Sequence, residues 1–257
     1  MSASEKTSWG NVANWYDQLV DGQSSNYQKD LILPNLLRCL ELKPEQRLLD
    51  LACGQGFFTR AFSENGAHVM GMDISEELIQ IAKKNESQAP KIIPYIVGSA
   101  EDLSVLPASA RFELITIVLA IQNISQPHLV FKACSERLMP GGRLVLVLNH
   151  PAFRIPKSSE WGWDDKKQVQ YRRIERYSSE FSQKMQMHPG SQPEVVTYTY
   201  HRPLQYFIKH LVRAGFVVSN LEEWVSHKQS DSGPRALAEN MARREIPIFL
   251  YLEAKKI

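Results

Sequence analysis

Two glycines stand one residue apart, just after a short apolar run that contains an acid. The run is Arg47–Leu51 with Asp50 inside it, and Gly54 and Gly56 follow. An apolar run of this length is typical of a strand buried on both faces, and the residues after Phe57 favour a helix. Glycines let a ligand approach the backbone, and a helix N-terminus offers unpaired N–H groups to an anion. The stretch therefore favours a site for a nucleotide-like ligand, although a tight strand–helix turn without a ligand has the same pattern.

Further polar residues follow the next two apolar runs. Asp73 ends the second run, seventeen residues after Gly56, and a carboxylate there can accept hydrogen bonds from both hydroxyls of a ribose. Ser99 and Glu101 follow the third run, in position to meet the edge of a base. The carboxyl ends of parallel strands form one rim of a sheet, where open α/β folds bind ligands. A dinucleotide fingerprint would need a third glycine where this chain has Thr59, which disfavours a nicotinamide-dependent oxidoreductase.

One histidine on the same rim is the first candidate for acid–base chemistry. His150 directly follows the fifth apolar run, so we predict a general base or a substrate-orienting group there. The competing interpretation is a loop histidine that is hydrogen-bonded to the backbone. The pair His201-Arg202 is the second choice, against a helix-capping role.

The segment 153–177 is rich in basic and aromatic residues. Such a mixture suits an acidic small molecule or stacking on nucleic-acid bases, and a solvated lid anchored by tryptophans is the alternative. We predict that it covers the substrate. The predicted substrate contacts in this half of the chain are Asn149, Arg154, Trp161, His201 and Arg202.

The elements that must position these residues alternate along the chain. Short apolar runs predict strands at 47–51, 68–73, 92–97, 112–119, 143–148, 195–200, 216–224 and 246–253. Helical spacing predicts helices at 27–42, 57–65, 127–138, 204–214 and 234–244, and another that Ser75 caps. This alternation predicts βαβ units in a parallel sheet, with a hairpin-like antiparallel addition at the end. Outside 195–200, residues 151–200 show no regular pattern, which predicts a functional lid or a mobile segment.

Length and composition bound the class of protein. The chain has 257 residues, 43% of them hydrophobic, which suits one large α/β domain or two small ones. A formal net charge of +2 is too small to indicate nucleic acid by itself. The three cysteines have neither disulfide nor metal spacing, so we expect a reducing, cytoplasmic setting and no metal site. We expect no secretory signal and no membrane span.

The N-terminal residues 1–26 are polar but carry aromatic side chains. Trp15 and Tyr16 suggest an arm that folds back, either to anchor itself in the core or to close over a ligand. We predict that these two residues also contact the substrate. We interpret the chain as a single domain with four parts: this arm, a cofactor-binding core at 27–150, a substrate-cover insertion at 151–202, and a C-terminal completion of the sheet at 203–257.

The series of motifs resembles the class I S-adenosylmethionine (SAM)-dependent methyltransferases, specifically the small-molecule methyltransferase type 11 group. The resembling stretches lie within residues 27–150, and their order is as specific as their content. They are Leu48 to Gly56, Gly71 to Ser75, Gly98 to Leu103, Phe112 to Ala120, and Leu138 to Arg143.

The resemblance implies a fold and a cofactor. The fold is a Rossmann-like seven-stranded, mostly parallel sheet of order 3-2-1-4-5-7-6, with strand 7 antiparallel, helices on both faces and a lid insertion after strand 5. The cofactor is SAM, and its product is S-adenosylhomocysteine (SAH). The implied cofactor-binding residues are Tyr27, Asp50, Ala52, Cys53, Gly54, Gly56, Phe57, Asp73, Ile74, Ser99, Ala100, Glu101, Leu119 and Ala120.

The resemblance also assigns roles within that set. The loop from Asp50 to Gly56 would hold the methionine part, Asp73 the ribose, and Ile74 would flank the adenine. Ser99 to Glu101 would contact the adenine edge, and Leu119-Ala120 the sulfur side. This chain departs from the family in two places. Ser99 stands where an aspartate is frequent, and Gln122-Asn123 stand where two histidines are frequent, so no base is guaranteed there.

These observations predict SAM-dependent methyl transfer to an oxygen or nitrogen, or to a carbon, of a small molecule. The alternatives are a methyltransferase that modifies RNA or protein, which a net charge of +5 over 151–213 permits, and a non-catalytic SAM-binding module. Nucleic acid is not expected as a partner because no RNA-binding appendage is recognisable. We expect a monomer or a homodimer.

Overall fold

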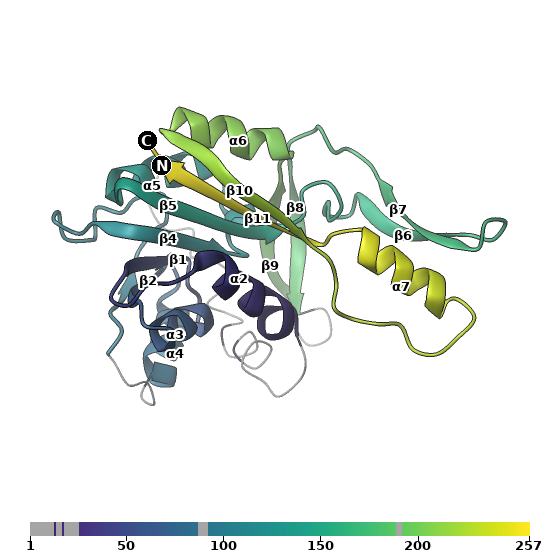
Figure 1. Ribbon diagram of the computed structural model, residues 1–257, viewed down its shortest axis with the longest axis horizontal. Helices are drawn as coiled ribbons and strands as arrows, with labels where there is room; N and C mark the ends of the chain where they lie inside the picture. The colour runs from purple at the N-terminus through teal and green to yellow at the C-terminus, as the bar shows by residue number, and fades with distance from the viewer. Residues whose placement is uncertain (1–12, 14–16, 18–25, 87–91, 189–191) are drawn as a thin grey trace.

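The structure is a computed structural model that describes residues 13, 17, 26–86, 92–188 and 192–257. Its centre is a seven-stranded sheet that crosses the molecule (Figure 1). In spatial order the strands run β10-β11-β5-β4-β1-β2-β3. Their bounds are β1 Arg47–Leu51, β2 His68–Asp73, β3 Tyr95–Val97, β4 Phe112–Val118, β5 Leu138–Asn149, β10 Phe216–Trp224 and β11 Phe249–Lys256.

The directions of the strands confirm the predicted sheet. Five strands run parallel to one another: β3, β2, β1, β4 and β5. β11 pairs antiparallel with both β5 and β10. Read from the other edge, the order is 3-2-1-4-5-7-6, with β11 in place 7 and β10 in place 6. The carboxyl ends of the parallel strands therefore share one rim.

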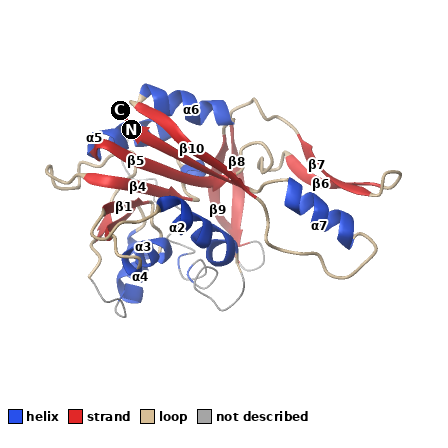
Figure 2. Cartoon of the chain, viewed as in Figure 1, coloured by secondary structure: helices blue, strands red, loops and turns tan. Residues whose placement is uncertain are grey.

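Alternation along the central strands explains why helices cover both faces (Figure 2). In β1, the side chain of Leu48 packs with α2 and α3, whereas Leu49 packs on the other face with α5 and α6. Both leucines are fully buried, as a strand between two helical layers requires. The helical segments are η2 Gln28–Ile32, α2 Leu33–Leu40, α3 Phe57–Glu64, α4 Glu76–Asn85, η4 Ile121–Asn123, α5 Pro127–Arg137, α6 Leu204–Arg213 and α7 Ala236–Glu245.

The segment after β5 differs from the prediction. Instead of an irregular lid, it forms two antiparallel hairpins: β6 (Ser159–Asp164) with β7 (Val169–Ile174), and β8 (Phe181–His188) with β9 (Gln192–His201). The prediction that only 195–200 would be regular is wrong. Most side chains of β6 and β7 are at least partly exposed on both faces, so these strands lack the alternation that marks a half-buried strand.

The two hairpins lie in different places. β6, β7 and α7 lie together at one end of the molecule, whereas β8 and β9 run across the carboxyl rim of the sheet (Figure 1). β9 contacts the short helix η4 that follows β4. This contact brings the insertion against the rim that carries the glycine loop.

Candidate active site

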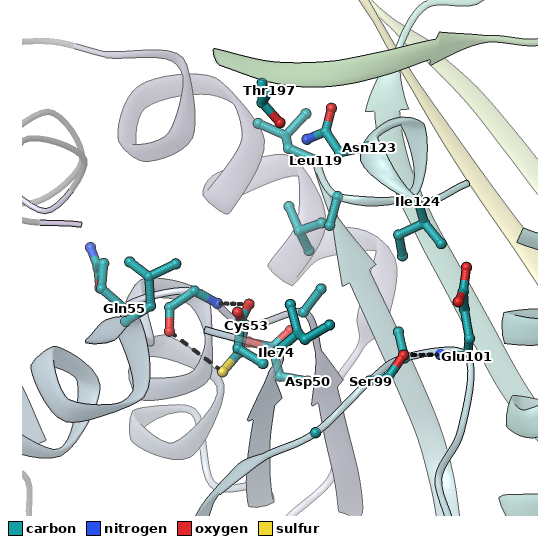
Figure 3. A pocket seen from close by; sticks show the side chains of 18 of the residues that line it. Asp50, Cys53, Gln55, Ile74, Ser99, Glu101, Leu119, Asn123, Ile124 and Thr197 are labelled. Carbon is teal, nitrogen blue, oxygen red and sulfur yellow. Dashed lines mark hydrogen bonds between the residues drawn. The ribbon is translucent and has the colours of Figure 1, made fainter. Parts of the chain in front are cut away.

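A cavity of about 480 Å³ opens at the carboxyl rim of the sheet. Its walls come from the loops after β1, β2, β3 and β4 and from β9 (Figure 3). Cys53 and Gln55 of the glycine loop lie at one end of the cavity, and Asn123 and Thr197 lie at the other. Cavities of this size commonly hold small-molecule ligands.

The glycine loop turns the chain from β1 into α3 through three residues with positive φ. They are Ala52 at 58°, Gly54 at 58° and Gly56 at 82°. Gly56 also lies against Tyr95, and a Cβ at this position would stand 2.6 Å from the tyrosine oxygen. Both its conformation and its packing therefore require glycine.

Asp50 is the buried acid at the base of this loop. Its Oδ2 accepts a 2.6 Å hydrogen bond from the hydroxyl of Thr59, and its Oδ1 accepts one of 2.9 Å from Thr116. Burial raises the pKa of Asp50 to about 6, although both threonine hydroxyls oppose the shift. Thr59, where a dinucleotide fingerprint would have glycine, thus holds the acid.

Asp73 closes the cavity at the end of β2. Its two carboxylate oxygens accept 2.9 Å hydrogen bonds from the backbone N–H groups of Gly54 and Ser75. Burial raises the pKa of Asp73, and these backbone donors oppose that shift. The backbone of Ile74 also contributes to this opposing effect. A carboxylate accepts about four hydrogen bonds, so Asp73 has capacity for a further donor. Beside it, the apolar side chain of Ile74 lines the cavity and remains 52% exposed, a surface on which a flat ring can lie.

The part of the cavity wall that follows β3 is hydrogen-bonded to the loop before α5. The hydroxyl of Ser99 accepts a hydrogen bond from the N–H of Glu101. Oε1 of Glu101 in turn accepts one of 3.1 Å from the N–H of Gln126. These bonds fix the two polar side chains that face the cavity here.

Comparison with known proteins identifies the site. A family model described as a methyltransferase domain, of type 11, matches residues 49–146. A crystal structure of an S-adenosylmethionine-dependent methyltransferase from Mesorhizobium loti superposes with a TM-score of 0.66 and 26% identity. It covers 86% of this chain and 96% of its own. These matches show that this chain contains a SAM-dependent methyltransferase domain of class I. Its cofactor is SAM.

Other similar proteins match different fractions of this methyltransferase chain. An uncharacterized protein of Haemophilus influenzae is 28% identical over 87% of this chain and 86% of its own length. A ubiquinone biosynthesis O-methyltransferase of Coxiella burnetii is 34% identical over 42% of this chain, and the match spans 46% of the relative's length. The glycopeptide N-methyltransferase MtfA in complex with SAM shares the fold, with a TM-score of 0.59 at 17% identity over 92% of this chain and 98% of its own.

The structure gathers twelve of the fourteen sequence-predicted cofactor residues around the cavity of the methyltransferase. They are Asp50, Ala52, Cys53, Gly54, Phe57, Asp73, Ile74, Ser99, Ala100, Glu101, Leu119 and Ala120. The other two do not line it. Gly56 lies behind the loop against Tyr95, and the hydroxyl of Tyr27 is hydrogen-bonded to Ser226 over 3.0 Å.

Sequence reasoning missed the wall that β9 provides. Val196, Thr197, Tyr198 and Tyr200 line the cavity, as do residues 123–125 after β4. The alternation over 195–200 indicated a strand, but nothing in the local sequence indicated where that strand would lie. The remaining lining residues that were missed are Gln55, Phe58, Leu78, Gly98 and Val118.

His150 does not line the cavity. It is 4% exposed, and its Nε2 lies 2.7 Å from Oε1 of Glu223 on β10. Its Nδ1 accepts hydrogen bonds from the N–H groups of Ala152 and Phe153, so Nε2 carries the proton and donates to Glu223. Burial lowers the pKa of His150, which favours this neutral form.

The predicted substrate residues fall into three groups. Asn149, Arg154, His201 and Arg202 line a second cavity of about 20 Å³, here called the side cavity. Tyr200 lines both cavities, so the two adjoin. Trp161 lies on β6 beneath the guanidinium of Arg172, away from both. Trp15 and Tyr16 lie outside the described residues.

Two negative findings concern only the described part of the chain. No group of three or more histidine, cysteine or acidic side chains there is arranged to hold a metal ion. No helix there is long and apolar enough to cross a bilayer.

Proposed function

We propose that this methyltransferase methylates an oxygen or nitrogen atom of a small molecule. The observation that carries the proposal is the position of β9, whose Thr197, Tyr198 and Tyr200 wall the cavity opposite the glycine loop. A cavity of about 480 Å³ suits a cofactor and a small acceptor better than a polymer. A relative that matches part of the chain is a ubiquinone biosynthesis O-methyltransferase, which supports a small-molecule acceptor.

The residues of the rim have the chemistry that the parts of SAM require. The carboxylate of Asp73 is the acceptor for the ribose hydroxyls, and Ile74 offers an exposed apolar surface to the adenine. Ser99 and Glu101 are held in place beside it for the base edge. The glycine loop admits the methionine part against the backbone, near Asp50. Leu119 and Ala120 face the sulfur side.

SAM supplies a methyl group that is already activated as a sulfonium. The protein therefore has to align the acceptor for in-line displacement and exclude water. We assign the alignment to Asn123 and Thr197, which line the end of the cavity away from the glycine loop (Figure 3). Tyr200, which also lines the cavity, contributes to it. The reaction leaves SAH in the site.

Incubation with methyl-labelled SAM and a fractionated cell extract tests the proposal. We expect label in a small-molecule fraction. Label in RNA that falls steeply as salt is added would instead support an RNA-modifying enzyme, and label in protein would support a protein-modifying one. SAM binding without label in any fraction would support a non-catalytic module.

A further inference from the structure

The side cavity carries more positive charge than its surroundings neutralise. Arg202 is only 7% exposed, and Arg154 is partly buried beside it, over the ring of Phe249. Within the described part of the chain neither guanidinium forms an ion pair with a carboxylate, and no acidic residue is among those that line the side cavity. The exposed Glu180 acts on Arg202 only at longer range. A buried charge without a partner is costly, so such a cavity calls for an anion.

One of the two terminal nitrogens of the Arg202 guanidinium is hydrogen-bonded, and the other has no partner among the described residues. Its Nη2 donates a 2.6 Å hydrogen bond to the carbonyl of Ser125, and the rings of Tyr200 and Tyr206 flank the guanidinium. Its Nη1 is buried and has no hydrogen-bond partner among the described residues. The group is therefore oriented in advance, with a donor available to an oxygen acceptor.

The geometry points to a function for this charge. Resting on the proposed function, we infer that the side cavity binds a carboxylate of the methyl acceptor, while the atom to be methylated lies in the main cavity past Tyr200. The acceptor class is thus a small organic acid with a hydroxyl or amine elsewhere in the molecule. A volume of about 20 Å³ admits one small polar group.

One feature of the side cavity favours a different occupant. Oε1 of Gln122 is also buried and finds no partner in the described part of the chain, while its Nε2 donates to the carbonyl of Leu119. An acceptor beside a donor suits a hydroxyl, a carboxamide or a water molecule. The two guanidiniums outweigh this single acceptor in charge, and the experiment compares the two kinds of occupant directly.

Three probes that each carry one methyl group separate the possibilities. Acetate, acetamide and methylphosphonate are titrated against the SAH-bound protein, and binding is followed by saturation transfer to each methyl signal. We expect acetate to bind about tenfold more tightly than the other two, the difference of a charge-assisted pair. Tighter binding of acetamide or of methylphosphonate overturns the inference. So does binding of none, which would make the side cavity a water site.

Substitutions tie the binding to this cavity. Arg202→Gln is expected to weaken acetate binding about tenfold, and Arg202→Lys to weaken it less. Since Arg202 also holds the loop at Ser125, Arg154→Gln serves as a second variant if circular dichroism shows that Arg202→Gln is unfolded. Arg244→Gln, on the exposed face of α7, is the matched control. Equal acetate binding in wild type, Arg202→Gln and Arg154→Gln overturns the inference.

Turnover distinguishes a failure of this inference from a failure of the proposed function. A labelled product that carries a carboxylate, shown by carbodiimide coupling to an amine, supports the inference. A labelled product without a carboxylate overturns it while the proposed function stands. Absence of any labelled product contradicts the proposed function, but the acetate titration is read without turnover and still decides the inference.

Discussion

The backbone N–H of Gly54 donates a 2.9 Å hydrogen bond to Oδ2 of Asp73. This bond joins the glycine loop after β1 to the acid at the end of β2, nineteen positions further along the chain. The two parts of the cofactor site are therefore fixed relative to each other before a ligand enters. Substitution of the acid should disturb both the charge that we assign to ribose binding and the position of the loop.

We expect Asp73→Asn to weaken SAM binding by about tenfold to a hundredfold, because it replaces a charged acceptor with an amide. Isothermal titration calorimetry with SAM measures the change. Asp165→Asn, an exposed acid at the end of the β6–β7 hairpin, is the matched control and should bind SAM as wild type does. Wild-type affinity in Asp73→Asn would contradict the role given to this carboxylate.

SAM binding should also depend on pH through Asp50. With its pKa raised to about 6 by burial, Asp50 is ionised at pH 7.5 and attracts the cationic cofactor. As the pH falls through 6 the group takes up a proton and the attraction is lost, so the SAM dissociation constant should rise by up to about tenfold per pH unit. Titrations between pH 5 and pH 8, roughly spanning that pKa, measure this slope. Asp50→Asn should flatten it, and an unchanged slope in this variant would assign the titration to another group.

Gly71 leaves room for the ring of Tyr95. A Cβ at Gly71 would lie 2.6 Å from two ring carbons of Tyr95 and 3.1 Å from Sγ of Cys53. Gly71→Ala should lower the free energy of unfolding by about 1–3 kcal/mol through overpacking. Urea denaturation measures the change. Gly233→Ala, whose Cβ would meet nothing within 4 Å, provides the reference and should lie within about 0.5 kcal/mol of wild type.

We predict that His150 stabilises the fold and does not take part in the reaction. It ties the loop after β5 to Glu223, so His150→Ala leaves the N–H groups of Ala152 and Phe153 without their acceptor. We expect the unfolding free energy to fall by about 1–3 kcal/mol while SAM affinity stays unchanged. His68→Ala, at an exposed position on β2, serves as the control.

The pH dependence of the unfolding free energy is a second test of the structural role of His150. Its pKa is lowered in the folded state, so the unfolded chain binds more protons at mildly acidic pH. The stability that His150 contributes is present at neutral pH and decreases as the pH falls below its usual pKa of about 6.5. Loss of turnover in His150→Ala at wild-type stability would instead support the general base that the sequence predicts.

The sequence predicted the parts of the site that depend on local chemistry. Local signals for strand ends, turns and helix starts were enough to find Asp50, Gly54 and Asp73. Adjacent parallel strands bring such positions to one rim of the sheet. The alternation predicted a parallel sheet with an antiparallel addition, and the order of the strands followed from the family resemblance.

The parts that the sequence missed depend on contacts between distant segments. β9 reaches the cavity through contacts such as that of Thr199 Oγ1 with the carbonyl of Gln122, 77 positions away. The environment of His150 is likewise set by Glu223, 73 positions away. A histidine at a strand end has the same local sequence whether it turns toward the rim or away from it, so only the tertiary packing decides its role.

The hairpin of β8 and β9 forms a sheet of its own and pairs with no strand of the central seven among the described residues. It therefore contributes a wall to the cavity without sharing the hydrogen-bond ladder that holds the cofactor loops. Mutations can accumulate in this hairpin at little cost to the cofactor half of the site. The hairpin is thus the natural unit for evolution, or for a protein engineer grafting segments between relatives, to exchange when a new acceptor is to be methylated.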